Sequence, residues 1–248
     1  MSTVVAQSLP ASVSLLEVDD LHVAYGKAEV VSGVSFKVQA GQFVVMLGRN
    51  GAGKSTILHA LSGLIPKVKG TVRFNGVDIT KTSAAEIVRI GLVQVLEGHR
   101  VFTSLTVEDN LLIGTYAKTH RGDPKKLDRI YALFPEMAEK RHQDASRLSG
   151  GQQQILAVAQ GIIGEPKLLI LDEPSGGLAP LVIDRILSVA AELSRGGLAI
   201  LLIEQLVEKA LRNAQHCLLL ETGRIAGQGD PRTLQNSGMI QKIYLGGH

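Results

Sequence analysis

The alternation of apolar and polar residues divides the chain into short buried strands and amphipathic helices. Uninterrupted apolar runs cover residues 43–47, 168–171 and 198–203. Runs of this length are typical of parallel strands that are covered on both faces. After two of these runs, apolar residues recur every three or four positions, over 57–64 and 183–193, and predict helices. This pattern indicates an α/β fold with a mainly parallel sheet.

Weaker patterns predict antiparallel strands and a helical insertion. Residues 15–38 favour edge strands, and 71–74 with the Asn75-Gly76 pair favour a hairpin. From about residue 97 to 157 the apolar spacing becomes helical, first over 107–116 and then over 127–134. A last hairpin is predicted around 221–224 and a short helix over about 236–246.

The segment Gly-Arg-Asn-Gly-Ala-Gly-Lys-Ser-Thr, residues 48–56, fits the pattern G-x-x-x-x-G-K-[ST] between a predicted strand and a predicted helix. Its glycines let backbone N–H groups turn toward phosphate oxygens, and the helix start adds the positive end of its dipole. Lys54 can reach the β- and γ-phosphates of a nucleoside triphosphate, and the Ser55 hydroxyl is placed to ligate Mg²⁺. The alternative is a chance glycine-rich turn. The candidate nucleotide-binding residues here are Gly48, Asn50, Gly51, Gly53, Lys54, Ser55 and Thr56.

Two carboxylates, Asp172 and Glu173, follow the apolar run 168–171. At the carboxyl end of a parallel strand, Asp172 can hold Mg²⁺ through water. Glu173 is suited to orient the water that attacks the γ-phosphate, or to accept its proton. The alternative is an exposed acidic turn after a buried strand.

Residues 148–152, Leu-Ser-Gly-Gly-Gln, open a predicted helix upstream of these carboxylates. Ser149 can cap the helix, and Gly150 and Gly151 expose N–H groups at its N-terminus, which makes a second anion site. This segment, which ends at Gln152, resembles the signature of ATP-binding cassette (ABC) ATPases, and its order along the chain is also theirs. The resemblance implies a P-loop NTPase (RecA-like) core, an antiparallel β subdomain and an inserted helical subdomain. It also implies that residues 149–152 contact the γ-phosphate held by an opposite subunit.

The resemblance assigns further residues around the nucleotide. Tyr25 stands where the family places an aromatic residue that stacks on adenine. Most relatives carry a glutamine about five residues before a phenylalanine, here Phe102, and that place is held by Glu97. Gln94 matches the residue type but lies three residues too early. We therefore predict that Glu97, and not Gln94, senses the γ-phosphate and Mg²⁺.

Two departures from the family concern catalysis and the dimer contact. Gln205 stands where most relatives have a histidine, and it has no titratable proton near neutral pH. Glu173 is then left as the base, while Gln205 positions groups at the γ-phosphate. The loop 175–180 also lacks the aspartate that is usual in the family's dimer contact.

Four segments together resemble the smaller ATPase subunit of branched-chain, or hydrophobic, amino-acid importers. These subfamily segments are residues 97–102, 177–180, 203–205 and 244–246. The resemblance implies polytopic permease partners, a second ATPase subunit or a second copy, and an indirectly coupled periplasmic binding protein. It also implies a peripheral location on the cytoplasmic face of the membrane. Urea and short-amide importers are the alternative. Two other functions are less favoured. ABC ATPases of DNA repair or translation carry long coiled coils or paired cassettes, for which a chain of this length has no room. A P-loop kinase has no need of the signature at residues 148–152.

Composition adds limits to this interpretation. The 248 residues suit a single domain, expected over 15–246 after a loose tail at 1–14. The expected core covers about 15–96 and 158–235, the helical subdomain about 97–157 and a C-terminal helix about 236–246. Although 45% of the residues are hydrophobic, no run approaches the roughly 20 needed to cross a bilayer. The net charge of +3 is scattered and aromatics are 4%, which argues against nucleic acid. Beyond the Mg²⁺ that accompanies ATP we predict no metal.

Overall fold

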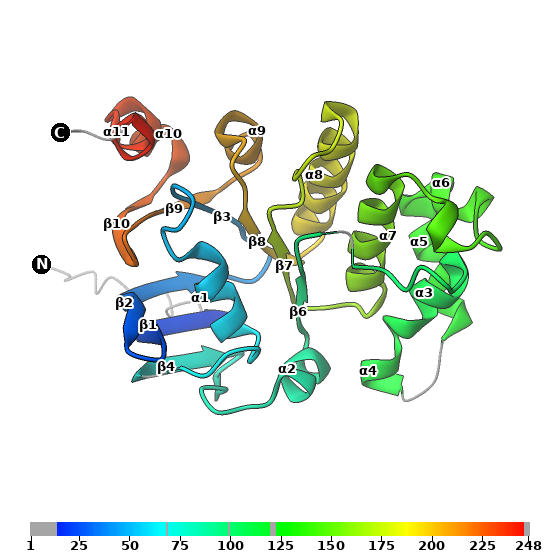
Figure 1. Cartoon of the computed structure of the whole chain (residues 1–248), viewed down its shortest axis with the longest axis horizontal. Helices are drawn as coiled ribbons and strands as arrows, with labels where there is room; N and C mark the ends of the chain where they lie inside the picture. The colour runs from blue at the N-terminus through cyan, green and yellow to red at the C-terminus, as the bar shows by residue number, and fades with distance from the viewer. Residues whose placement is uncertain (1–13, 68, 99, 120–122, 246–248) are drawn as a thin grey trace, which may run out of the picture.

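The computed structural model describes residues 14–67, 69–98, 100–119 and 123–245. Apart from Ser14, the predicted tail lies outside the described residues, and so do His99 and Gly246 of the subfamily segments. Figure 1 shows a smaller antiparallel sheet beside a larger sheet that is surrounded by helices. None of the helices in the described ranges combines the length and the apolar character that crossing a bilayer requires.

The larger sheet has six strands in the order β10-β9-β3-β8-β7-β6. Strands β9, β3, β8, β7 and β6 run parallel, and β10 returns antiparallel to β9 at the predicted hairpin. Every residue of β3, β7 and β8 is buried, as the continuous apolar runs predicted, so the α/β prediction is confirmed. The strands are β3 (Phe43–Leu47), β6 (Leu92–Val95), β7 (Leu168–Asp172), β8 (Ala199–Ile203), β9 (His216–Glu221) and β10 (Arg224–Gly229).

The smaller sheet is antiparallel, in the order β2-β1-β4-β5. Asn75 and Gly76 form the turn between β4 and β5 with φ values of 51° and 79°, which confirms the predicted hairpin. Both residue types tolerate this left-handed backbone. The strands are β1 (Leu16–Tyr25), β2 (Ala28–Val38), β4 (Lys69–Phe74) and β5 (Val77–Asp78).

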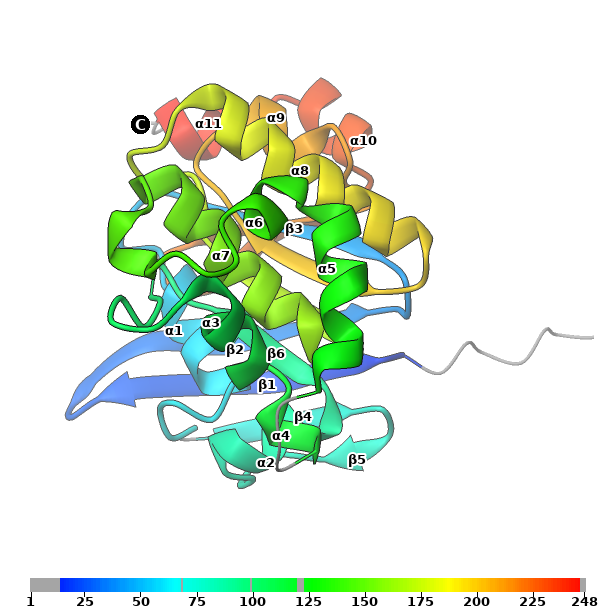
Figure 2. The same cartoon turned by 90° about the vertical axis from the view of Figure 1, so that its right-hand side faces the viewer.

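Helices cover both faces of the larger sheet. On one face Val44 and Met46 of β3 pack with α1 (Lys54–Leu61) and with the smaller sheet. On the other face Val45 and Leu47 join the core formed with α7 (Gly150–Ile163) and α8 (Pro180–Arg195), which lie in front of the sheet in Figure 2. The carboxyl ends of the parallel strands, where α/β sheets bind ligands, therefore lie between α1 with the smaller sheet on one face and α7 with α8 on the other.

A group of short helices lies beyond β6, at the right of Figure 1. It consists of α3 (Val107–Ile113), α4 (Tyr116–Thr119), α5 (Leu127–Leu133), α6 (Pro135–Glu139) and the 3₁₀ turns Pro124–Lys126 and Ala145–Arg147. The helix predicted over 107–116 breaks because the N–H and the hydroxyl of Thr115 both donate to the Leu112 carbonyl, at 3.0 and 2.8 Å. This local bonding closes a tight turn in place of a further helical turn.

The C-terminal region holds two helices where one was predicted. These are α10 (Pro231–Asn236) and α11 (Met239–Leu245), and Gly238 between them has a φ of 72°. A left-handed glycine ends a helix. The two other helices are α2 (Ala84–Ile90) and α9 (Val207–Leu211).

Candidate functional site

The loop between β3 and α1 is built on glycines that no larger residue can replace without strain. Gly51 and Gly53 have φ values of 79° and 102°. A Cβ on Gly48 would lie 2.4 Å from the carbonyl oxygen of Leu220, so the loop passes directly against β9. No side chain caps α1 at Gly53, which leaves its first N–H groups to a ligand. The loop and helix start therefore offer an anion site.

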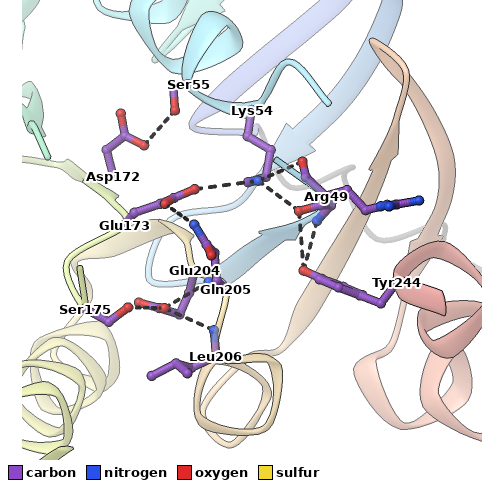
Figure 3. Close-up of polar contacts among 11 residues, drawn as sticks. Arg49, Lys54, Ser55, Asp172, Glu173, Ser175, Glu204, Gln205, Leu206 and Tyr244 are labelled. Atoms are coloured by element: carbon purple, nitrogen blue, oxygen red, sulfur yellow. Dashed lines mark hydrogen bonds and ion pairs between the residues drawn. The ribbon is translucent and has the colours of Figure 1, made fainter. Parts of the chain in front are cut away.

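Lys54 is buried at the start of α1, with 4% of its surface exposed. Its Nζ donates to the carbonyl oxygens of Gly48, at 2.8 Å, and Arg49, at 3.2 Å. It also lies 3.6 Å from Oε1 of Glu173 (Figure 3). A buried ammonium needs such acceptors, and a phosphate would be a stronger one.

A hydrogen bond between Ser55 and Asp172 connects the start of α1 with the end of β7. The Ser55 hydroxyl donates to Oδ1 of Asp172 at 3.1 Å, and the Asp172 side chain is nearly buried. Burial raises the pKa of Asp172, and the nearby Glu173 and Glu97 carboxylates raise it further. The hydrogen bond from Ser55 and the nearby His59 act in the opposite direction on this pKa. Two oxygen ligands beside further carboxylates are a donor set suited to Mg²⁺.

Glu173 leaves the end of β7 with a φ of 44°, an uncommon backbone conformation for a residue with a side chain. Its N–H donates to the Ile203 carbonyl at 3.0 Å, which holds the turn against β8. Its Oε2 accepts a hydrogen bond of 2.5 Å from Nε2 of Gln205, as Figure 3 shows. The carboxylate is thus fixed between Lys54 on one side and Gln205 on the other.

Lys54, Ser55, Glu173 and Gln205 line one cavity of about 430 Å³. Asp172 is not part of the lining and adjoins it through its hydrogen bond with Ser55. The cavity lining combines most of the loop with both predicted glutamates and Gln205. The lining residues are Val30, Asn50, Gly51, Gly53, Lys54, Ser55, Thr56, Glu97, Glu173 and Gln205. A larger hollow of about 690 Å³, bordered by 129–133 and 192–198, contains none of the predicted site residues. Chemistry and not size therefore selects the smaller cavity.

The two candidates for sensing the γ-phosphate, Glu97 and Gln94, lie in different places. Glu97 lines the cavity, and its Oε1 lies near the loop after Glu173, 3.9 Å from where a Cβ on Gly176 would stand. Gln94 lies within β6, outside the lining, and its Nε2 donates to Oδ2 of Asp172 at 3.3 Å. Gln94 therefore supports Asp172, a contact that its position in a strand did not reveal.

The signature segment and Tyr25 lie apart from this cavity. Ser149 caps α7, accepting from the N–H of Gln152, while the Gln152 side chain accepts from the Ser149 N–H. Gly151 packs against Val182 of α8. None of the segment's residues, Gly150 included, lines the cavity. Tyr25 ends β1 with 51% of its surface exposed and does not line it either.

Sequence reasoning missed the contact of α11 with the loop. The Tyr244 hydroxyl accepts from the Gly48 N–H at 3.2 Å and lies 3.5 Å from the Gly48 carbonyl oxygen (Figure 3). Burial raises the pKa of Tyr244. His59 was also missed, and its Nε2 lies 3.9 Å from Oδ2 of Asp172. No local pattern signals either contact, since the partners are distant in sequence or lie outside the motif.

Comparisons with known proteins identify the family. A family model described as ABC transporter matches residues 31–176. The high-affinity branched-chain amino acid transport ATP-binding protein BraG of Pseudomonas aeruginosa is 37% identical, over 94% of this chain and 100% of its own. The probable branched-chain amino acid transport ATP-binding protein LivF of Archaeoglobus fulgidus is 31% identical, over 94% and 99%. The phosphonates import ATP-binding protein PhnC of Trichormus variabilis is 35% identical, over 89% and 95%.

Solved structures share the fold. A nucleotide-free ATP-binding cassette from an ABC transporter superimposes with a TM-score of 0.83, at 24% identity, over 95% of this chain and 100% of that chain. An ATP-binding subunit of an ABC transporter gives a TM-score of 0.82, at 26% identity, over 94% and 98%. The chain therefore belongs to the ABC transporter family, as an ATP-binding cassette that hydrolyses ATP to energise transport.

Proposed function

We propose that this chain energises an importer of branched-chain or other hydrophobic amino acids by hydrolysing ATP with Mg²⁺ in the cavity between Lys54 and Glu173. The observation that carries the chemistry is the cavity lined by the buried Lys54, by Ser55 and by the oriented Glu173, with Asp172 hydrogen-bonded to Ser55 at 3.1 Å. The subfamily segments support the assignment of the cargo. So does the similarity to BraG and LivF, which are both described as branched-chain amino acid transport ATP-binding proteins.

Residues of the loop bind the triphosphate. Lys54 exchanges its carbonyl partners and Glu173 for phosphate oxygens, because the phosphate charge is the stronger acceptor for a buried ammonium. The uncapped N–H groups of α1 face the same charge. Ser55 and, through water, Asp172 hold Mg²⁺, which neutralises charge on the phosphates when bound.

Glu173 and Gln205 prepare the attacking water. Once Lys54 turns to phosphate, Glu173 keeps its bond from Gln205 and is free to accept a proton from water. Gln205 fixes the carboxylate and takes no part in proton transfer, since an amide does not titrate near neutral pH. Glu97 lines the same cavity and there senses the γ-phosphate and Mg²⁺.

The proposed partners rest on the resemblance to ABC ATPases. In that family the signature segment contacts the nucleotide of an opposite subunit, and we propose the same role for residues 149–152 in a head-to-tail dimer. Capped by Ser149, the N-terminus of α7 provides the anion site for that contact. We propose a second, different ATPase subunit as the usual partner, on permease subunits at the cytoplasmic face of the membrane, with a periplasmic binding protein coupled indirectly.

Transport in cells tests the proposal. Cells from which this chain is deleted should lose ATP-dependent uptake of labelled leucine, isoleucine and valine. The wild-type chain should restore uptake, whereas the matched Glu173→Gln variant should not, because it lacks the base. Unchanged uptake of all three amino acids in the deletion strain would contradict the assignment of the cargo.

The same strain tests the other cargoes. Loss of urea or short-amide uptake alone would move the protein to that related group of importers. Loss of phosphonate uptake alone would place it with PhnC, whose identity of 35% is close to that of BraG.

A further inference from the structure

Glu204, directly after β8, is a carboxylate with no exposed surface. Its Oε1 accepts three hydrogen bonds: from the Ser175 hydroxyl, from the Gln205 N–H at 2.9 Å and from the Leu206 N–H at 3.1 Å. Its Oε2 has no hydrogen-bond partner among the described residues. A buried carboxylate is costly unless donors compensate it, so these three donors hold Glu204 in place, and it holds them.

The three donors come from the two segments that flank the catalytic carboxylate. Ser175 lies two residues after Glu173, and Gln205 is the residue that bonds Glu173. The contacts close a ring, from Glu173 along the chain to Ser175, across to Glu204, on to Gln205 and back to Glu173 (Figure 3). Within this ring, Glu204 accepts the backbone N–H of Gln205, the same residue whose side chain donates to Glu173.

A second contact ties the same two segments together farther along. Lys209 of α9 donates to the Pro180 carbonyl at 3.1 Å and to Oδ1 of Asp184 at 2.7 Å. Residues 204–209 are therefore attached to residues 175–184 at both ends. The segments that carry Glu173 and Gln205 are thus joined by two separate sets of contacts.

We propose that Glu204 is a positioning residue for ATP hydrolysis, which holds Gln205 against Glu173 and links this pair to the loop 175–180. The inference rests on the proposed roles of Glu173 and Gln205. The Glu204 side chain is fully buried and is not part of the cavity lining. Its effect on the reaction passes through the amide of Gln205.

Glu204→Gln is the main test, since it preserves volume and one acceptor oxygen but replaces charge-assisted hydrogen bonds by weaker neutral ones. In the purified full-length chain, kcat for ATP should fall about 10-fold while KM changes less than about 2-fold. Ser175→Ala removes one donor and should lower kcat in the same way. Glu208→Gln, an exposed glutamate nearby, is the matched control and should leave kcat unchanged.

A double mutant separates positioning from a general structural role. If Glu204 acts through Gln205, then Glu204→Gln should slow the Gln205→Ala enzyme by less than about 2-fold, because the group it positions is gone. Effects that multiply in the double mutant, or an unchanged kcat in Glu204→Gln, would overturn the inference.

Glu173→Gln, measured beside these variants, keeps this inference distinct from the proposed function. An inactive Glu173→Gln with a normal Glu204→Gln refutes only the positioning role. A normal Glu173→Gln refutes the proposed base, and the inference falls with it.

Discussion

Removal of one hydroxyl group tests whether α11 supports the phosphate-binding loop. In Tyr244→Phe the buried N–H of Gly48 loses the oxygen that it donates to at 3.2 Å. An unsatisfied buried donor costs about 1–3 kcal/mol, and the partial exposure of Tyr244 favours the low end, about 1 kcal/mol. For a chain of this size, that loss lowers Tm by about 2–4 °C. ATP affinity should weaken by no more than about 5-fold, because the loop keeps its glycines and Lys54.

Calorimetry of the nucleotide-free chain and an ATP titration measure these two quantities. Tyr116→Phe is the matched control, since Tyr116 is 51% exposed and its hydroxyl has no hydrogen bond among the described residues. The control should change stability by less than about 0.5 kcal/mol. Equal Tm values for Tyr244→Phe and the wild type, or an equal drop in the control, would refute the reasoning.

Three other predictions follow from the cavity. Lys54→Ala should weaken ATP binding itself in an equilibrium titration, and wild-type affinity would contradict the lysine's role. Glu97→Ala should uncouple ATPase activity from substrate in the assembled transporter while Gln94→Ala perturbs β6, and the reverse pattern would show that the register is wrong. Burial raises the pKa of Asp172, so the folded state binds its proton more tightly than the unfolded state, and stability falls as pH rises through this pKa. Asp172→Asn should therefore raise the Tm of the nucleotide-free chain at pH 7 and abolish the extra stabilisation by ATP with Mg²⁺. A lowered Tm without nucleotide would contradict this.

The hydrophobic pattern was sufficient for the architecture of the core. Continuous apolar runs predicted β3, β7 and β8, and the turn residues Asn75 and Gly76 predicted a hairpin that the structure contains. The ends of helices were harder to predict, because they depend on single local contacts. The break at Thr115 comes from its bonds to one carbonyl, and the break at Gly238 from one left-handed residue.

The candidate site likewise contains contacts that the sequence predicted and contacts that it did not. Ser55, next to Lys54, contacts Asp172 because the carboxyl ends of β3 and β7 lie at the same end of the parallel sheet, on either side of β8. Motif order and strand direction already imply this placement. Tyr244 and Glu204 were not assigned to the site from the sequence. Their contacts depend on how α11 and the segment after β8 pack, and no spacing rule encodes that packing.

ATP hydrolysis by Glu173→Gln is the measurement that tests the account most directly. The variant preserves size and hydrogen bonding but removes the base that lies between Lys54 and Gln205. ATP should still bind, while hydrolysis falls by about 10²–10⁴-fold and the chain accumulates as an ATP-bound dimer on a sizing column. Near-normal turnover in this variant would contradict the central claim that Glu173 activates the attacking water.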